Sequence, residues 1–145
     1  MKKIGLAADH AGFKVKEFIK NQLLMQGKNV VDFGTNSEES VDYPDFAHAL
    51  AQSIEKKEVD FGITVCGTGN GINMVANKYP FIRSALCWNT EIAKLAVTHN
   101  NANICAIPGR YLSNNEAMEI VNVFFEYEFE GGRHQKRIDK IPIKK

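Results

Sequence analysis

The chain has 145 residues, of which 44% are hydrophobic and 24% charged, and its net charge is +1. These values are typical of one globular domain, residues 1–145, with a core of its own. The small net charge gives no reason to expect a nucleic-acid partner, and no apolar run approaches the ~20 residues of a membrane helix. The first apolar stretch is too short for a signal peptide and ends at Asp9 and His10, so we expect a cytoplasmic protein.

Strand and helix patterns alternate along the whole chain. Short apolar runs predict strands over residues 3–8, 29–33, 60–65, 83–87 and 103–107. Helical periodicity predicts helices over residues 11–26, 43–57, 69–77, 90–98 and 114–128. This alternation indicates an α/β fold with three α/β/α layers, in which a Rossmann-like parallel sheet of five strands is covered on both faces.

The most informative motif is the hexapeptide CGTGNG at residues 66–71, between an expected strand and an expected helix. Its glycines allow backbone N–H groups to surround an anion, and Cys66 adds a thiol with a tendency toward the thiolate form. The spacing matches neither the GxGxxG dinucleotide fingerprint nor a Walker loop. Two interpretations remain open: an anion site with a reactive thiol, or a tight turn with a buried cysteine.

The three cysteines form no CxxC pair and no metal-ligand spacing, so we expect free thiols and no metal site. Cys87 and Cys105 lie within apolar strand patterns, which is typical of inert core residues. Only Cys66 has a setting that favours chemistry.

Several polar residues follow the expected strands directly. In a parallel sheet, ligands bind beyond the carboxyl ends of the strands, where Asp9, His10, the glycine loop and Arg110 are expected to converge. Asp9 also fits a helix cap. His99 fits the end of a helix, where a cation is favourable, as well as it fits a catalytic role.

The tail carries the basic sequence GGRHQKR at residues 131–137. A solvated basic tail is one interpretation, and a phosphate clamp of paired arginines is the other, because guanidinium groups match phosphate oxygens. The tail, residues 131–145, extends past the last expected helix and is predicted to reach a partner subunit. Tyr43, before Pro44, fits either a packed aromatic or a flat surface for a sugar ring.

Taken together, these segments resemble the ribose/allose/galactose phosphate isomerase family, and within it the type B ribose-5-phosphate isomerases. The matching segments occur in the family's order and are ADHAG (8–12), DFGT (32–35), DYPD (42–45), CGTGNGI (66–72), NK (77–78), RSAL (83–86), HNNAN (99–103) and GGRHQKR (131–137).

The resemblance implies an aldose–ketose isomerase that needs no metal or organic cofactor. Cys66 would move a proton from C2 of the open sugar to C1 through an enediolate, and His99 would assist ring opening with Asp9 and Thr68. Backbone amides of the loop would hold the oxyanion. The substrate-binding residues implied are His10, Tyr43, Gly67, Gly69, Asn70, Gly71, Asn100, Arg110, Arg133, His134 and Arg137.

The resemblance also implies a homodimer with shared active sites, or a tetramer, in which the tail arginines act on the partner chain. The expected reaction interconverts ribose 5-phosphate and ribulose 5-phosphate in the pentose phosphate pathway. The alternatives are an allose-6-phosphate or galactose-6-phosphate isomerase, or a non-catalytic protein that binds phosphosugars.

Overall fold

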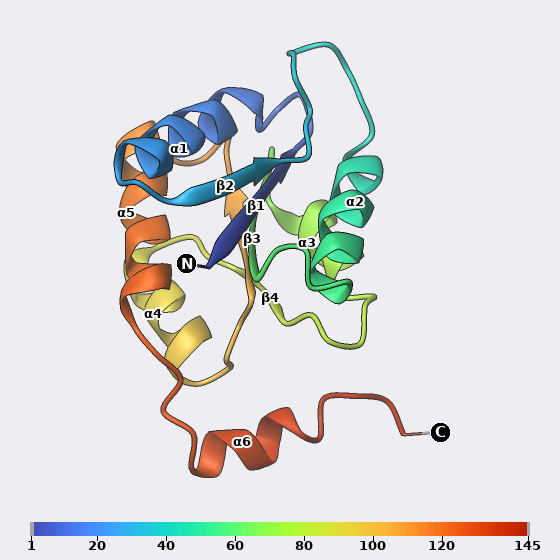
Figure 1. The fold of residues 1–145 in the computed structure, drawn as a ribbon, viewed down its shortest axis with the longest axis vertical. Helices are drawn as coiled ribbons and strands as arrows, with labels where there is room; N and C mark the ends of the chain where they lie inside the picture. The colour runs from blue at the N-terminus through green and yellow to red at the C-terminus, as the bar shows by residue number, and fades with distance from the viewer. Residues whose placement is uncertain (1, 145) are drawn as a thin grey trace.

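The structure is a computed structural model that describes residues 2–144, and its centre is one parallel sheet with the strand order β2-β1-β3-β5-β4 (Figure 1). The strands are β1 (Lys3–Ala8), β2 (Asn29–Asp32), β3 (Phe61–Cys66), β4 (Ser84–Leu86) and β5 (Ile104–Pro108). The helices are α1 (Phe13–Met25), α2 (Tyr43–Glu55), α3 (Asn70–Ala76), α4 (Thr90–Thr98), α5 (Asn114–Glu126) and α6 (Arg133–Ile138). The predicted α/β fold with five parallel strands is confirmed.

Helices cover both faces of the sheet, with α1, α4 and α5 on one face and α2 and α3 on the other (Figure 1). Two glycines paired across β1 and β3, Gly5 and Gly62, make room for α2. A Cβ on Gly62 would lie 2.8 Å from Leu50 Cδ2, and one on Gly5 would also meet the Leu50 side chain. The side chain of Leu50 therefore packs directly on the backbone of the two strands. Within residues 2–144, no helix has the length and apolar content of a membrane-spanning segment.

The expected elements differ from the observed ones by only a few residues at their ends. The exception is α6, a helix that the sequence patterns did not predict. It follows Gly131 and Gly132, which both have a positive φ, and its six residues are too few to show a helical period. The basic tail is therefore partly helical.

A buried lysine joins α1 to the end of β2. Lys16 is fully buried, and its Nζ donates hydrogen bonds to Asp32 Oδ2 and Glu17 Oε2, both at 2.7 Å. Burial alone would raise the pKa of Asp32, but hydrogen bonds from Lys16, Gly34 and Lys20 hold this pKa below its ordinary value. The ionised carboxylate is thus the stable form next to the lysine.

This ionic contact also positions the chain beyond β2. Asp32 Oδ1 accepts a hydrogen bond from the Gly34 N–H at 2.9 Å. Residues 34 and 35 then pair with Ala8 through Gly34 O and the Thr35 N–H, both at 2.8 Å. The network therefore fixes the loop beside the last residue of β1, next to Asp9.

We predict that Lys16→Met lowers the free energy of unfolding by about 3 kcal/mol, because it leaves the Asp32 carboxylate without its buried partner. Urea unfolding measures the change. The control is Lys14→Met on the same helix, because the Lys14 side chain is 77% exposed and its ion pair is with the exposed Glu38. Equal losses in the two variants would contradict the role given to the buried contact.

Candidate active site

The ends of β1, β3 and β5 are held together by backbone hydrogen bonds that continue past the strands. The Asp9 N–H donates to Val65 O at 3.3 Å, and the Gly109 N–H donates to Cys66 O at 2.9 Å. The Arg110 N–H donates to Gly67 O at 3.0 Å. The residues expected to converge at the carboxyl edge of the sheet are therefore brought together there.

Cys66 is the last residue of β3, and its side chain lies inside the turn that follows. The residue is 4% exposed, and its Sγ accepts a hydrogen bond from the Gly69 N–H at 3.1 Å. Gly69 has a φ of 77°, which turns the chain back so that its amide faces the sulfur. An N–H directed at the sulfur stabilises negative charge on it. The turn and the thiol therefore form one unit, and the two interpretations of the motif are compatible.

The rest of the loop is closely flanked by two side chains. A Cβ on Gly71 would lie 2.7 Å from Tyr43 Oη, and a Cβ on Gly67 would lie 3.2 Å from Arg110 Cδ. Tyr43 can lie this close to the loop because position 71 is glycine, and a side chain at position 67 would crowd Arg110. The exposed residues Thr68 and Asn70 are linked by a hydrogen bond from the Asn70 N–H to Thr68 Oγ1 at 3.2 Å.

Asp9 and His10 complete this end of the sheet. Asp9 is 7% exposed, and its Oδ1 accepts from the Gly12 N–H at 3.1 Å, so it closes the turn before α1. His10 Nδ1 accepts from the Val41 N–H at 3.1 Å. Because Nδ1 accepts, a neutral His10 carries its proton on Nε2, and that nitrogen is a donor for an anion.

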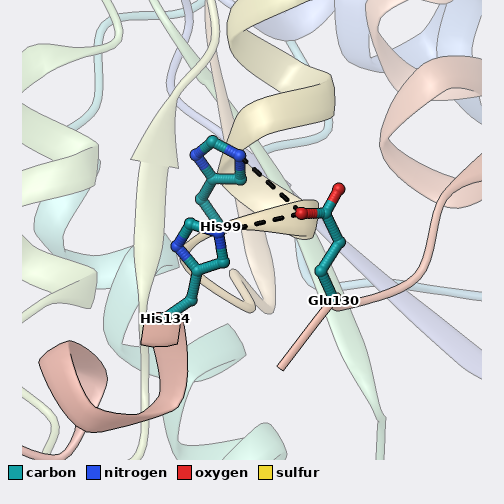
Figure 2. A group of neighbouring side chains, drawn as sticks. All are labelled: His99, Glu130 and His134. Atoms are coloured by element: carbon teal, nitrogen blue, oxygen red, sulfur yellow. Dashed lines mark ion pairs between the residues drawn. The ribbon is translucent and has the colours of Figure 1, made fainter. Parts of the chain in front are cut away.

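A second group of predicted site residues lies around the start of α6. A cavity of about 470 Å³ is lined by His99, Asn100, Arg133, His134 and Arg137, with Ile138 and Ile141. The rings of His99 and His134 stack with centroids 4.1 Å apart, and both face Glu130 (Figure 2). Two arginines and two histidines beside one cavity form a site suited to a phosphate group.

The two groups lie at opposite ends of the sheet. Cys66 pairs with Pro108 at the carboxyl end, whereas Gly62 pairs with Ile104 at the amino end, four residues or about 13 Å away. His99 ends α4, before β5 begins, so it lies beyond that amino end. One chain therefore does not bring His99 to Cys66, Asp9 or Thr68.

The other two cysteines lie in the core, as predicted. Cys87 and Cys105 are fully buried, and burial together with the neighbouring Cys87 raises the pKa of the Cys105 thiol well above its ordinary value. All three cysteines are free thiols, and only Cys66 lies at the end of the sheet where ligands bind.

The family is decided by a family model, described as Ribose/Galactose Isomerase, that matches residues 4–141. The chain belongs to the Ribose/Galactose Isomerase family. Among curated relatives, the ribose-5-phosphate isomerase B of Escherichia coli K12 is 41% identical, with 97% of this chain and 95% of the relative covered. A probable ribose-5-phosphate isomerase B of Mycoplasma genitalium is 43% identical, with 95% and 92% covered.

Two solved structures of ribose-5-phosphate isomerases are similar to this chain in fold over nearly its whole length. A ribose 5-phosphate isomerase from Thermotoga maritima has a TM-score of 0.95 and 53% identity, with 97% of each chain covered. The Mycoplasma genitalium ribose-5-phosphate isomerase B, solved with bound ribulose-5-phosphate, has a TM-score of 0.92 and 42% identity, with 96% of this chain and 93% of that chain covered.

In this isomerase, Glu130 was not predicted from the sequence; its carboxylate faces Nε2 of both stacked histidines. The residue directly precedes the GGRHQKR motif, but a single acidic residue in an irregular segment gives no periodic or spacing signal. The Val41 N–H that bonds to His10 was likewise not predictable, because a backbone donor leaves no mark in the sequence.

Proposed function

We propose that this chain interconverts ribose 5-phosphate and ribulose 5-phosphate, with Cys66 as the base that moves the proton between C2 and C1. The observation that carries the proposal is the Cys66 sulfur at the end of β3, with the Gly69 amide directed at it and Arg110 beside the loop. We place the enzyme in the cytoplasm and in the pentose phosphate pathway.

The proposed chemistry uses only side chains and backbone amides. The Cys66 thiolate takes the proton from C2 of the open aldose, and the electron pair of that C–H bond forms the enediolate. Return of the proton to C1, together with transfer of a proton from the C2 hydroxyl to the C1 oxygen, gives the ketose. Amides of residues 67–71 hold the negative oxygen as it forms, which is the type of stabilisation that contributes most in many enzymes.

Ring opening and phosphate binding are assigned to the remaining residues. His99 donates a proton to the ring oxygen, with Asp9 and Thr68 acting at the sugar hydroxyls. Arg133 and Arg137 bind the phosphate together with His10 and Arg110, with His134 nearby and Tyr43 and Asn100 against the sugar. Binding energy from the phosphate, which does not react, serves to hold the carbon skeleton against Cys66.

This assignment requires two copies of the chain. Residues of the Cys66 group and of the His99 group lie at opposite ends of one sheet, too far apart to share one small sugar phosphate. We therefore propose a homodimer, or a tetramer made of two such dimers, in which the His99 end of one chain completes the Cys66 end of the other. A two-fold interface would give two equivalent sites.

Isomerisation of six-carbon sugar phosphates remains the second candidate function, because the family description includes galactose. A pocket distinguishes one extra carbon by only ~1–3 kcal/mol, so activity on allose 6-phosphate is compatible with the same site. Galactose-6-phosphate isomerases resemble this family but divide the two residue groups between different chains. This chain carries both groups, which favours the ribose-type enzyme.

We predict that the purified protein converts ribose 5-phosphate to ribulose 5-phosphate in the presence of EDTA. Cys66→Ala should lower turnover at least about a hundredfold, because it removes the base, while ribulose 5-phosphate binding persists. Cys87→Ala is the matched control, because it removes a fully buried thiol outside the site and should leave turnover intact. An inactive folded wild-type protein, or an active Cys66→Ala, would refute the proposal.

We also predict that two inactive variants restore activity when their subunits exchange. Mixing Cys66→Ala with Arg137→Ala gives hybrid dimers with one intact site, and roughly a quarter of the wild-type activity is expected from random pairing. The control mixes Cys66→Ala with Arg110→Ala, which alter the same end of the sheet, so neither site of a hybrid is intact. Recovery in the control, or no recovery in the first mixture after proven exchange, would contradict a shared site.

A further inference from the structure

Three side chains from separate segments meet at the amino end of the sheet (Figure 2). His99 follows α4, His134 belongs to α6, and Glu130 lies in the irregular segment between α5 and α6. Glu130 Oε1 lies 4.0 Å from His99 Nε2 and 3.7 Å from His134 Nε2. One carboxylate oxygen thus faces the same nitrogen of both rings, and Nδ1 of each ring points away from it (Figure 2).

The backbone holds Glu130 in this place. The Glu130 N–H donates a hydrogen bond to Thr98 O at 3.0 Å, and Thr98 is the buried residue just before His99. The backbone of Glu130 is therefore fixed beside His99, although 57% of the Glu130 side chain is exposed. A shift of about 1 Å within this exposed side chain would bring both contacts to ordinary hydrogen-bond length.

His134 gives an independent reason to expect such a contact. The residue is 6% exposed, and its Nε2 is buried without a hydrogen-bond partner among the described residues. Burial lowers the pKa of His134, as do the neighbouring His99, Arg133 and Arg137, whereas Glu130 acts in the opposite direction. A neutral His134 with its proton on Nε2 can donate to Glu130, and this contact gives a partner to a polar group that is otherwise buried and unpaired.

The same three residues offer ligand atoms within 4.8 Å of one another, so a bound metal ion is the competing interpretation. The two rings are stacked with only 17° between their planes. The Nε2 lone pairs therefore lie in nearly parallel planes and do not converge on a point about 2.0–2.1 Å from both nitrogens, as zinc requires. Hydrogen bonds to one carboxylate oxygen tolerate this offset better. The geometry of the cluster therefore favours hydrogen bonding to Glu130 over metal binding.

We infer that Glu130 is a positioning residue whose carboxylate accepts hydrogen bonds from Nε2–H of both His99 and His134, and so directs Nδ1 of His99 toward the sugar. The inference rests on the proposed function, in which His99 opens the ring. In that step the C1 hydroxyl gives its proton to Asp9, the bond between C1 and the ring oxygen breaks, and the ring oxygen takes the proton from His99 Nδ1. Glu130 stabilises the imidazolium form that precedes this transfer.

The contact itself is tested by NMR of protein labelled with ¹⁵N-histidine, without any substrate. We expect Nε2–H proton signals of His99 and His134 that exchange slowly with water, and both signals should disappear in Glu130→Ala. The control is Glu128→Ala, because Glu128 is exposed in the same segment and carries the same charge. Equal spectra for wild type and Glu130→Ala would overturn the inference.

The kinetic role is tested with two reactions of the same enzyme. Ribulose 5-phosphate has no furanose form, because its C5 hydroxyl is esterified, so exchange of its C1 proton with D₂O needs Cys66 but no ring opening. Glu130→Ala should slow conversion of ribose 5-phosphate at least about tenfold and leave this exchange within about twofold of wild type. Glu128→Ala should change neither reaction.

Two other outcomes with Glu130→Ala would overturn the inference. Equal losses of conversion and exchange in Glu130→Ala would assign Glu130 a merely structural role, and no loss in either would show that His99 acts without it. Both results overturn the inference. A wild-type protein that performs neither reaction would instead refute the proposed function, and the NMR signals would then decide whether Glu130 holds the two histidines.

Discussion

The common direction of the parallel strands is the constraint on which the arrangement of the functional residues depends. Every strand ends at one edge, so Asp9, Cys66 and Arg110 meet there through the backbone contacts that continue β1, β3 and β5. Each helix returns the chain to the other edge, and His99 at the end of α4 therefore lies away from Cys66. The same rule that brings one group together keeps the other group away from it, and the proposed site therefore needs a second chain to unite them.

The two groups offer complementary chemistry to the proposed sugar phosphate. The Cys66 end offers a sulfur, backbone amides and Tyr43, which suit a carbonyl carbon skeleton that changes charge during the reaction. At the other end, Arg133 and Arg137 line a cavity with His99 and suit a phosphate that keeps its charge. The buried Lys16–Asp32 contact belongs to the first group, because it fixes the loop beside Asp9.

Much of the fold could be predicted because local patterns and sheet topology agree. Strand β1 and helix α4 have the predicted bounds, and the glycine loop lies between strand and helix as its sequence indicates. The burial of Lys16 could not be predicted, because it depends on Asp32, 16 residues further along the chain. Glu130 and α6 were missed for the same kind of reason, since contacts with α4 give them their places.

The most direct test of the account is a crystal structure of this protein with ribulose 5-phosphate bound. We expect the carbonyl end of the ligand at Cys66 and the loop of residues 67–71, and the phosphate at Arg133 and Arg137 supplied by the other copy of the chain. A phosphate held only by the chain that supplies Cys66, without Arg133 and Arg137 of the other copy, would contradict the account, because one chain would then form the whole site.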